Sequence, residues 1–85
     1  MATTSRVREL EFLFSDDKQG ALAQTPFGQY EILMGQSGSW CAEFQLGNAC
    51  RILSRKHGVT CEQAITICQD DFKLRVHACL TEYEK

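Results

Sequence analysis

The chain has 85 residues, of which 44% are hydrophobic and 24% are charged, and this balance fits one small folded domain and excludes a disordered chain. Nine Lys and Arg residues against eleven Asp and Glu residues give a formal net charge of -2, which excludes the basic footprint of a general nucleic-acid binder. No apolar run approaches the roughly 20 residues that a membrane-spanning helix needs.

The first predicted element is a strand over Arg8–Phe14, preceded by a polar start at 1–6 that we expect to be flexible. Apolar and polar residues alternate in this strand with the period of two that is typical of a half-buried strand. The side that we expect to face the core carries Leu10, Phe12 and Phe14, and the other side carries Glu9, Glu11 and Leu13. Residues 15–20 have the composition of a turn.

A short second strand is predicted over Ala21–Gln24. It leads into the turn Thr25–Gly28, in which Pro26 fits the second position of a type I turn. Alternation then predicts two further strands, over Gln29–Met34 and Trp40–Leu46.

The next two residues, Gly47 and Asn48, are typical of a hairpin turn of the primed class, in which glycine supplies a positive φ. The partner strand of this hairpin is predicted over Ala49–Ser54.

From Thr60 onward the apolar period becomes helical, and we predict a helix from Cys61 to about Tyr83. Thr60 suits the N-cap, and Gln63 completes a capping box with it. Asp71 and Arg75 are expected to form a surface ion pair one turn apart. The apolar stripe of the helix consists of Cys61, Ile65, Cys68, Phe72, Val76, Cys79 and Tyr83.

Short strands followed by one long amphipathic helix predict a single α+β domain over 1–85. We expect an antiparallel meander of four to five short strands within 8–54, with the C-terminal helix, within 60–83, packed on one face. The expected core consists of Phe12, Phe14, Tyr30, Ile32, Trp40, Phe44, Ile65, Phe72 and Val76.

No arrangement of residues in the sequence predicts catalysis. His57 lies in a basic connection, and His77 lies two residues from Cys79, a spacing that sends helical side chains to different faces. Cys61, Cys68 and Cys79 share a helical face but lie about 10 and 16 Å apart along it, too far to share one ion. We therefore expect no enzyme activity, no cofactor and no metal.

The five cysteines are an odd number without a C-x-x-C pair, so they predict free thiols in a reducing compartment. The polar N-terminal stretch lacks the apolar region of a signal peptide, and we expect a cytoplasmic protein.

The sheet face that the helix leaves uncovered is the candidate site. Acidic residues around exposed leucines are typical of a docking surface for a larger protein with a basic surface. A solvated face and a homodimer contact remain alternatives, and so does a phosphate contact by Arg51, Arg55, Lys56 and His57. The residues predicted to bind a partner are Glu9, Glu11, Leu13, Glu31, Leu33 and Glu43, with Cys41 and Leu53 among their apolar neighbours.

Several stretches carry a resemblance to a known group of proteins. The chain contains A-Q-T-P-F-G-Q-Y-E-I at 23–32, then Trp40, then E-Q-A at 62–64 and Q-D-D-F-K-L-R-V at 69–76, followed by Leu80. It resembles small phage and prophage proteins that carry an A-x-T-P-F-G-x-Y-x-I hairpin, a following Trp, and a helix with E-E-A…A-Q-x-D-Y-x-x-R-I…L. It departs from them in having Cys68 for Ala, Phe72 for Tyr and no Trp in its first two strands.

The resemblance implies a phage-derived, cytoplasmic, non-enzymatic accessory protein and supplies no catalytic residues. The resulting hypothesis is a protein-binding module that docks on a host or phage protein and inhibits or redirects it, as anti-CRISPR inhibitors of host defence do. The alternatives are a structural or regulatory homo-oligomer and, less favoured by the charge, a nucleic-acid accessory factor.

Overall fold

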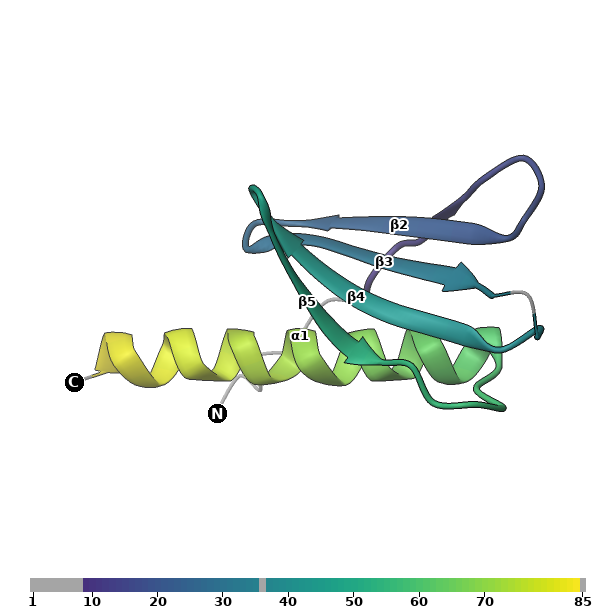
Figure 1. Ribbon diagram of the computed structural model, residues 1–85. Helices are drawn as coiled ribbons and strands as arrows, with labels where there is room; N and C mark the ends of the chain where they lie inside the picture. Colours follow the sequence, from purple (N-terminus) through teal and green to yellow (C-terminus); the bar gives the residue numbers. More distant parts are fainter. Residues whose placement is uncertain (1–8, 36, 85) are drawn as a thin grey trace.

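The computed structural model describes residues 9–35 and 37–84, with side chains as far as residue 78, so the start at 1–6 and Arg8 lie outside the described residues. It holds five antiparallel strands whose order in the sheet follows their order in the chain, and a C-terminal helix (Figure 1). The predicted α+β meander is confirmed. The elements are β1 (Leu13–Phe14), β2 (Gly20–Thr25), β3 (Gly28–Met34), β4 (Trp40–Leu46), β5 (Ala49–Ser54) and α1 (Cys61–Glu84).

Helix α1 lies across the lower face of the sheet in Figure 1, where its backbone runs near β3, β4 and β5. Its C-terminal turns, drawn in yellow, extend past the edge of the sheet. Among the described residues, the upper face carries no other element. No helix in the described residues has the length and apolar character to cross a membrane.

The start of α1 is fixed by two reciprocal hydrogen bonds. The Gln63 N–H donates to Thr60 Oγ1 at 3.1 Å, and the Thr60 N–H donates to Gln63 Oε1 at 2.9 Å. These bonds satisfy backbone donors that a helix N-terminus otherwise leaves unpaired, so the predicted capping box is confirmed. The N–H of Trp40 donates to the carbonyl of Val59 at 2.9 Å and holds this end of the helix beside β4.

The two hairpin turns whose class was predicted from the sequence, at Thr25–Gly28 and Gly47–Asn48, agree with the prediction. Neither Pro26 nor Phe27 has a positive φ, which excludes the primed turns and type II and agrees with type I. In the turn between β4 and β5, Gly47 has a φ of 59° and Asn48 does not have a positive φ, as in a type II′ turn.

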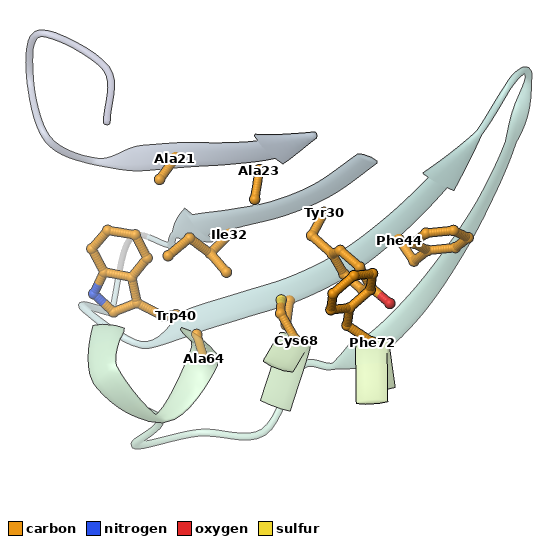
Figure 2. Packing of buried hydrophobic residues seen from close by; sticks show 10 residues of the cluster. Ala21, Ala23, Tyr30, Ile32, Trp40, Phe44, Ala64, Cys68 and Phe72 are labelled. Carbon is orange, nitrogen blue, oxygen red and sulfur yellow. The ribbon is translucent and has the colours of Figure 1, made fainter. Parts of the chain in front are cut away.

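The core lies between the sheet and α1 (Figure 2). Trp40 lies at one end near Ala64, and three aromatic rings gather at the other end, with Tyr30 tilted against Phe44 at 4.8 Å between ring centroids. The expected core residues that are buried are Tyr30, Ile32, Trp40, Phe44 and Phe72, whereas Phe12, Ile65 and Val76 are half-buried. Small residues outside the list of expected core residues are also buried: Ala21, Ala23, Ala42, Ala64 and Cys68. Cys68 belongs to the predicted apolar stripe of the helix.

The predicted first strand is mostly wrong, because only Leu13 and Phe14 pair with β2. The N–H of Leu10 donates to Gln69 Oε1 on α1 at 2.7 Å, so the chain leaves the sheet edge and runs toward the helix. Leu10 and Phe12 still pack against the core cluster. Phe14 points to the helix side but lies at the sheet edge, beyond the reach of α1, and its side chain is 45% exposed instead of buried.

A polar cluster joins the sheet to the helix inside this interface. The Tyr30 hydroxyl donates to Asp71 Oδ2 at 2.6 Å, and Arg75 Nε donates to the same oxygen at 2.7 Å. The guanidinium of Arg75 also lies over the ring of Phe44, 3.8 Å from its centroid. The predicted Asp71–Arg75 pair is therefore present, but it is part of the helix–sheet contact rather than a plain surface pair.

We predict that Gly28→Ala destabilises the fold by about 2–4 kcal/mol, the sum of backbone strain and overpacking. Gly28 has a φ of 152°, and a Cβ there would lie 2.5 Å from the carbonyl oxygen of Gln45 and 2.7 Å from Phe44 Cζ. The matched control is Gly38→Ala, because Gly38 also has a positive φ but has open space around it. Urea denaturation measures both changes, and equal losses of stability would contradict the steric part of this argument.

We predict that Tyr30→Phe lowers the free energy of unfolding by about 1–2 kcal/mol at neutral pH, because it removes the hydrogen bond to Asp71. Burial, followed by the hydrogen bond and charge of Asp71, raises the pKa of Tyr30 above its ordinary value of 10.0. The folded state therefore favours the neutral phenol, and this contribution to stability is lost as the pH rises above about 10. The stability difference between the two proteins should narrow above that pH in denaturation curves, and a constant difference up to pH 11 would contradict this assignment.

Candidate partner-binding face

The face of the sheet opposite α1 is called the open face here, and its central feature is a row of residues that crosses all five strands. The strand register aligns Leu13 with Leu22, Leu22 with Glu31, Glu31 with Glu43, and Glu43 with Ile52. The row therefore reads apolar, apolar, acidic, acidic, apolar. Leu33 and Cys41 form a second pair of cross-strand neighbours beside it on the same face.

Glu31 and Glu43 lie directly opposite each other on the two central strands, β3 and β4. Opposed residues of neighbouring strands have Cβ atoms about 4.5–5.5 Å apart, and like charges at such positions destabilise a sheet. Both glutamates are half-buried by their neighbours. The centre of the open face is thus a concentrated negative charge in a partly apolar setting.

A chain of side-chain hydrogen bonds leads to one of these carboxylates. Gln24 Nε2 donates to Gln29 Oε1 at 2.5 Å, and Gln29 Nε2 donates to Gln45 Oε1 at 3.1 Å. Gln45 Nε2 then donates to Glu31 Oε1 at 2.7 Å. This glutamine ladder crosses β2, β3 and β4 next to the acidic row, and through Gln45 it supplies a hydrogen-bond donor to the glutamate pair.

The second donor comes from a cysteine. Cys50 Sγ lies 3.4 Å from Glu43 Oε1 and donates its proton to it. This hydrogen bond, followed by desolvation and by the charges of Glu43 and Glu31, raises the pKa of the Cys50 thiol. Cys50 is exposed, but the raised pKa keeps its reactive thiolate scarce at neutral pH.

A hollow of about 540 Å³ opens on the same face, between β1, the loop 15–19, β2 and β3. Its apolar wall consists of Leu13, Leu22 and Leu33 of the open face, with Phe14, Ala21 and Met34 of the helix side bordering it at the sheet edge. Its acidic members are Glu31 and Asp17, and hydrogen bonds from the Ser15 hydroxyl and the Gln19 N–H hold the pKa of Asp17 below its usual range. Gly20 also lines the hollow, and a Cβ there would lie 2.9 Å from Leu33 Cδ2, so the absence of a side chain leaves this space open.

The structure brings together four of the six residues that the sequence predicted to bind a partner: Leu13, Glu31, Leu33 and Glu43. The other two, Glu9 and Glu11, lie outside the sheet. They line a smaller hollow with Pro26 and the core residue Phe72. Their strand periodicity suggested the open face, but Leu10 between them is bound to the helix.

Leu53 also lies elsewhere than expected, because it packs against the core cluster. The register shifts between the pairs Ala42–Ser54 and Glu43–Ile52, so Leu53 is the extra residue of a β-bulge. Sequence reasoning missed Leu22, Ile52 and the three glutamines of the ladder. The apolar residues at alternate strand positions were a usable signal, whereas the glutamine ladder depends on strand register, which the sequence does not reveal.

The basic residues that were considered for phosphate binding lie in two different parts of the structure. Arg51 lies opposite Phe44 in the sheet and lines a groove against α1 that also contains Asp70 and Asp71. Arg55, Lys56 and His57 are exposed and follow β5 in the connection to the helix. Carboxylates of α1 thus share the groove of Arg51, which weakens it as a phosphate contact.

The described part of the chain contains no group of three His, Cys, Asp or Glu side chains placed to hold a metal ion. Cys68 is fully buried, and burial, followed by the charge of Asp71, raises the pKa of its thiol to about 12. Cys68 is therefore a protonated, apolar core residue. Cys79 lies outside the described side chains.

The fold and the site define a small α+β domain with one open, acidic and apolar sheet face. No protein-family model, curated protein or solved structure matches the chain. The function must therefore be argued from the chemistry of the open face.

We predict that Glu43→Gln speeds the alkylation of Cys50 by iodoacetamide at pH 8. The substitution removes the negative charge that holds the proton on Sγ, so the pKa of Cys50 falls and its thiolate fraction rises. The control is Asp70→Asn, which removes an exposed carboxylate on α1. Peptide mass spectrometry measures the rate at each cysteine, and an unchanged rate at Cys50 would contradict the Glu43 contact.

Proposed function

We propose that this chain is a non-enzymatic protein-binding module that docks through its open face on a larger protein with a basic surface, and inhibits or redirects it. The observation that carries the proposal is the opposed pair Glu31–Glu43 at the centre of the sheet, with Leu22 and Ile52 on either side. Such a surface combines two negative charges, each with one hydrogen-bond donor from a neighbouring side chain, with exposed apolar area.

Both the acidic residues and the apolar residues of this surface cost the free protein stability. The opposed carboxylates repel each other, and the exposed leucine and isoleucine side chains leave apolar area in water. A partner with positive charges and apolar side chains relieves both costs at once, whereas solvent relieves neither fully. Complementary charge would also raise the rate of encounter with a basic partner.

We further propose that the module is phage-type and acts in the cytoplasm of a host cell, as an inhibitor of host defence of the anti-CRISPR kind. The support is the likeness of the T-P-F-G-Q-Y-E-I hairpin and the Q-D-D-F-K-L-R-V helix to small phage and prophage proteins, together with the small size and net negative charge.

A homo-oligomer is the second candidate function, and one observation favours it. β5 forms one edge of the five-stranded sheet and is exposed along most of its length. Unpaired strand edges can pair with a second copy. Light scattering at high protein concentration separates the two candidates, because a strict monomer excludes this one.

We predict that Glu31→Lys/Glu43→Lys abolishes capture of the partner when the tagged chain is incubated with host lysate. The reversal places two positive charges where a basic partner would dock, and captured proteins identified by mass spectrometry should also dissociate from the unmodified chain as salt is raised. The inhibitory part of the proposal is tested by assaying the activity of the captured protein with and without the chain.

The matched control is Glu62→Lys/Asp70→Lys, which reverses two exposed charges on α1, the helix that packs against the opposite face of the sheet. It should capture the same partner as the unmodified chain. Circular dichroism confirms that both variants fold. If the open-face variant retains every partner, the docking proposal is wrong.

A further inference from the structure

We infer that the open face recognises one arginine of its partner together with a large apolar side chain presented beside it. This inference rests on the proposed function, because it names the chemistry that the same face would bind. Two sites on the face carry it: the Glu31–Glu43 pair and the adjoining hollow, which is lined by Glu31 and by its cross-strand neighbour Leu22.

The glutamate pair fits a guanidinium group. Glu31 Oε1 already accepts from Gln45, and Glu43 Oε1 accepts from Cys50. The second oxygen of each carboxylate accepts no hydrogen bond from the residues that the structure describes. Two acceptors on neighbouring strands match a planar group that carries five donors in a fixed fork.

Arginine fits this position better than lysine. Its guanidinium is more weakly hydrated than an ammonium and can bind two carboxylates at once, whereas lysine presents one compact charge. The apolar neighbours Leu22 and Ile52 lie on either side of the glutamate pair in the same row. They provide a surface for the methylene groups of an arginine side chain.

The hollow supplies the second contact. Its volume of about 540 Å³ exceeds that of a single side chain, and lies within the range of about 300–1,000 Å³ that is usual for binding pockets. Leu13, Leu22 and Leu33 line it, and Leu13 is 77% exposed, so an inserted apolar side chain would cover surface that water now contacts. Apolar anchors in such pockets carry much of the affinity of protein interfaces.

The partner must place both side chains on one side of its own backbone, because the two sites adjoin. In an extended segment this spacing is i and i+2, and in a helix it is i and i+3 or i+4. A second copy of this chain is a poor occupant. A symmetric contact would bring the Glu31–Glu43 pair of one copy against the same pair of the other.

The test is a selection of displayed random peptides of about 12 residues on the immobilised full chain, followed by fluorescence anisotropy with the enriched peptides. We expect enriched peptides to carry Arg at one of these spacings from Leu, Ile, Met, Phe or Trp. Changing that Arg to Lys should weaken binding about fivefold or more, and Glu31→Gln/Glu43→Gln should weaken it about tenfold or more.

The hollow is tested separately by Leu33→Asn, which keeps an exposed side chain of similar size but makes it polar, and it should also weaken binding about fivefold or more. The control Glu62→Gln/Asp70→Asn removes two exposed carboxylates on α1 and should change affinity less than about twofold. Circular dichroism checks that each variant is folded.

The inference is overturned if no peptide is enriched, if the enriched peptides lack the paired Arg and apolar residue, or if Glu31→Gln/Glu43→Gln binds them unchanged. A dimer that dissociates on this substitution would also overturn it, because the face would then bind a second copy. If Glu31→Lys/Glu43→Lys still loses the captured partner in these cases, the proposed function stands and only the arginine recognition fails. If that variant retains the partner, the docking function itself fails.

Discussion

The fold depends on the contact between one helix and one face of the sheet, because this contact buries nearly all of the core. The buried cluster combines strand residues such as Tyr30, Ile32 and Phe44 with Ala64, Cys68 and Phe72 of the helix. Alanines and a cysteine in this interface leave room for the helix backbone to approach the sheet closely. The Tyr30–Asp71 hydrogen bond then restrains the rotation of the helix, because it is directional and joins α1 to β3, and the contact of Arg75 with the Phe44 ring adds to it.

A single helix cannot also cover the second face, and this limit creates the candidate site. α1 lies near β3, β4 and β5, so even the covered face needs help at its β1–β2 edge. Leu10 and Phe12 supply that help by leaving the sheet and packing against the core. The N-terminal segment therefore completes the covered side, and Glu9 and Glu11 go with it. Nothing in the described chain remains to cover the open face.

The sequence predicted much of this arrangement, because local rules govern most of it. Alternation fixed which strand residues face the core, and the Thr60–Gln63 capping box marked the start of the helix. The predicted strand Arg8–Phe14 has the right alternation, but only Leu13 and Phe14 pair with β2. The path of the preceding residues depends on the bond from Leu10 to Gln69, 59 positions away in the chain, which alternation cannot reveal. The buried alanines were missed for a related reason: alanine is common on surfaces and in cores alike, so its burial follows from where the helix lies.

Strand register explains what the sequence could and could not reveal about the site. Alternation predicts that Glu31 and Glu43 share a face, but it does not predict that they are direct neighbours. That depends on the lengths of the turns between β2, β3 and β4, which also align Gln24, Gln29 and Gln45 into a ladder. A shift of one residue between β3 and β4 would separate the acids, and a shift in either pairing would break the ladder.

The open face is consequently divided into two parts with different uses. On the ladder side, the amide groups of Gln24, Gln29 and Gln45 already satisfy one another, so a partner that replaced these bonds would gain little. On the other side, the leucines are exposed, and one oxygen of each glutamate accepts no hydrogen bond from the described residues, so a partner gains by covering them. Binding free energy should therefore concentrate at the boundary, where Glu31 belongs to both parts. The ladder holds the Glu31 carboxylate in place before a partner arrives. Less side-chain entropy is then lost on binding.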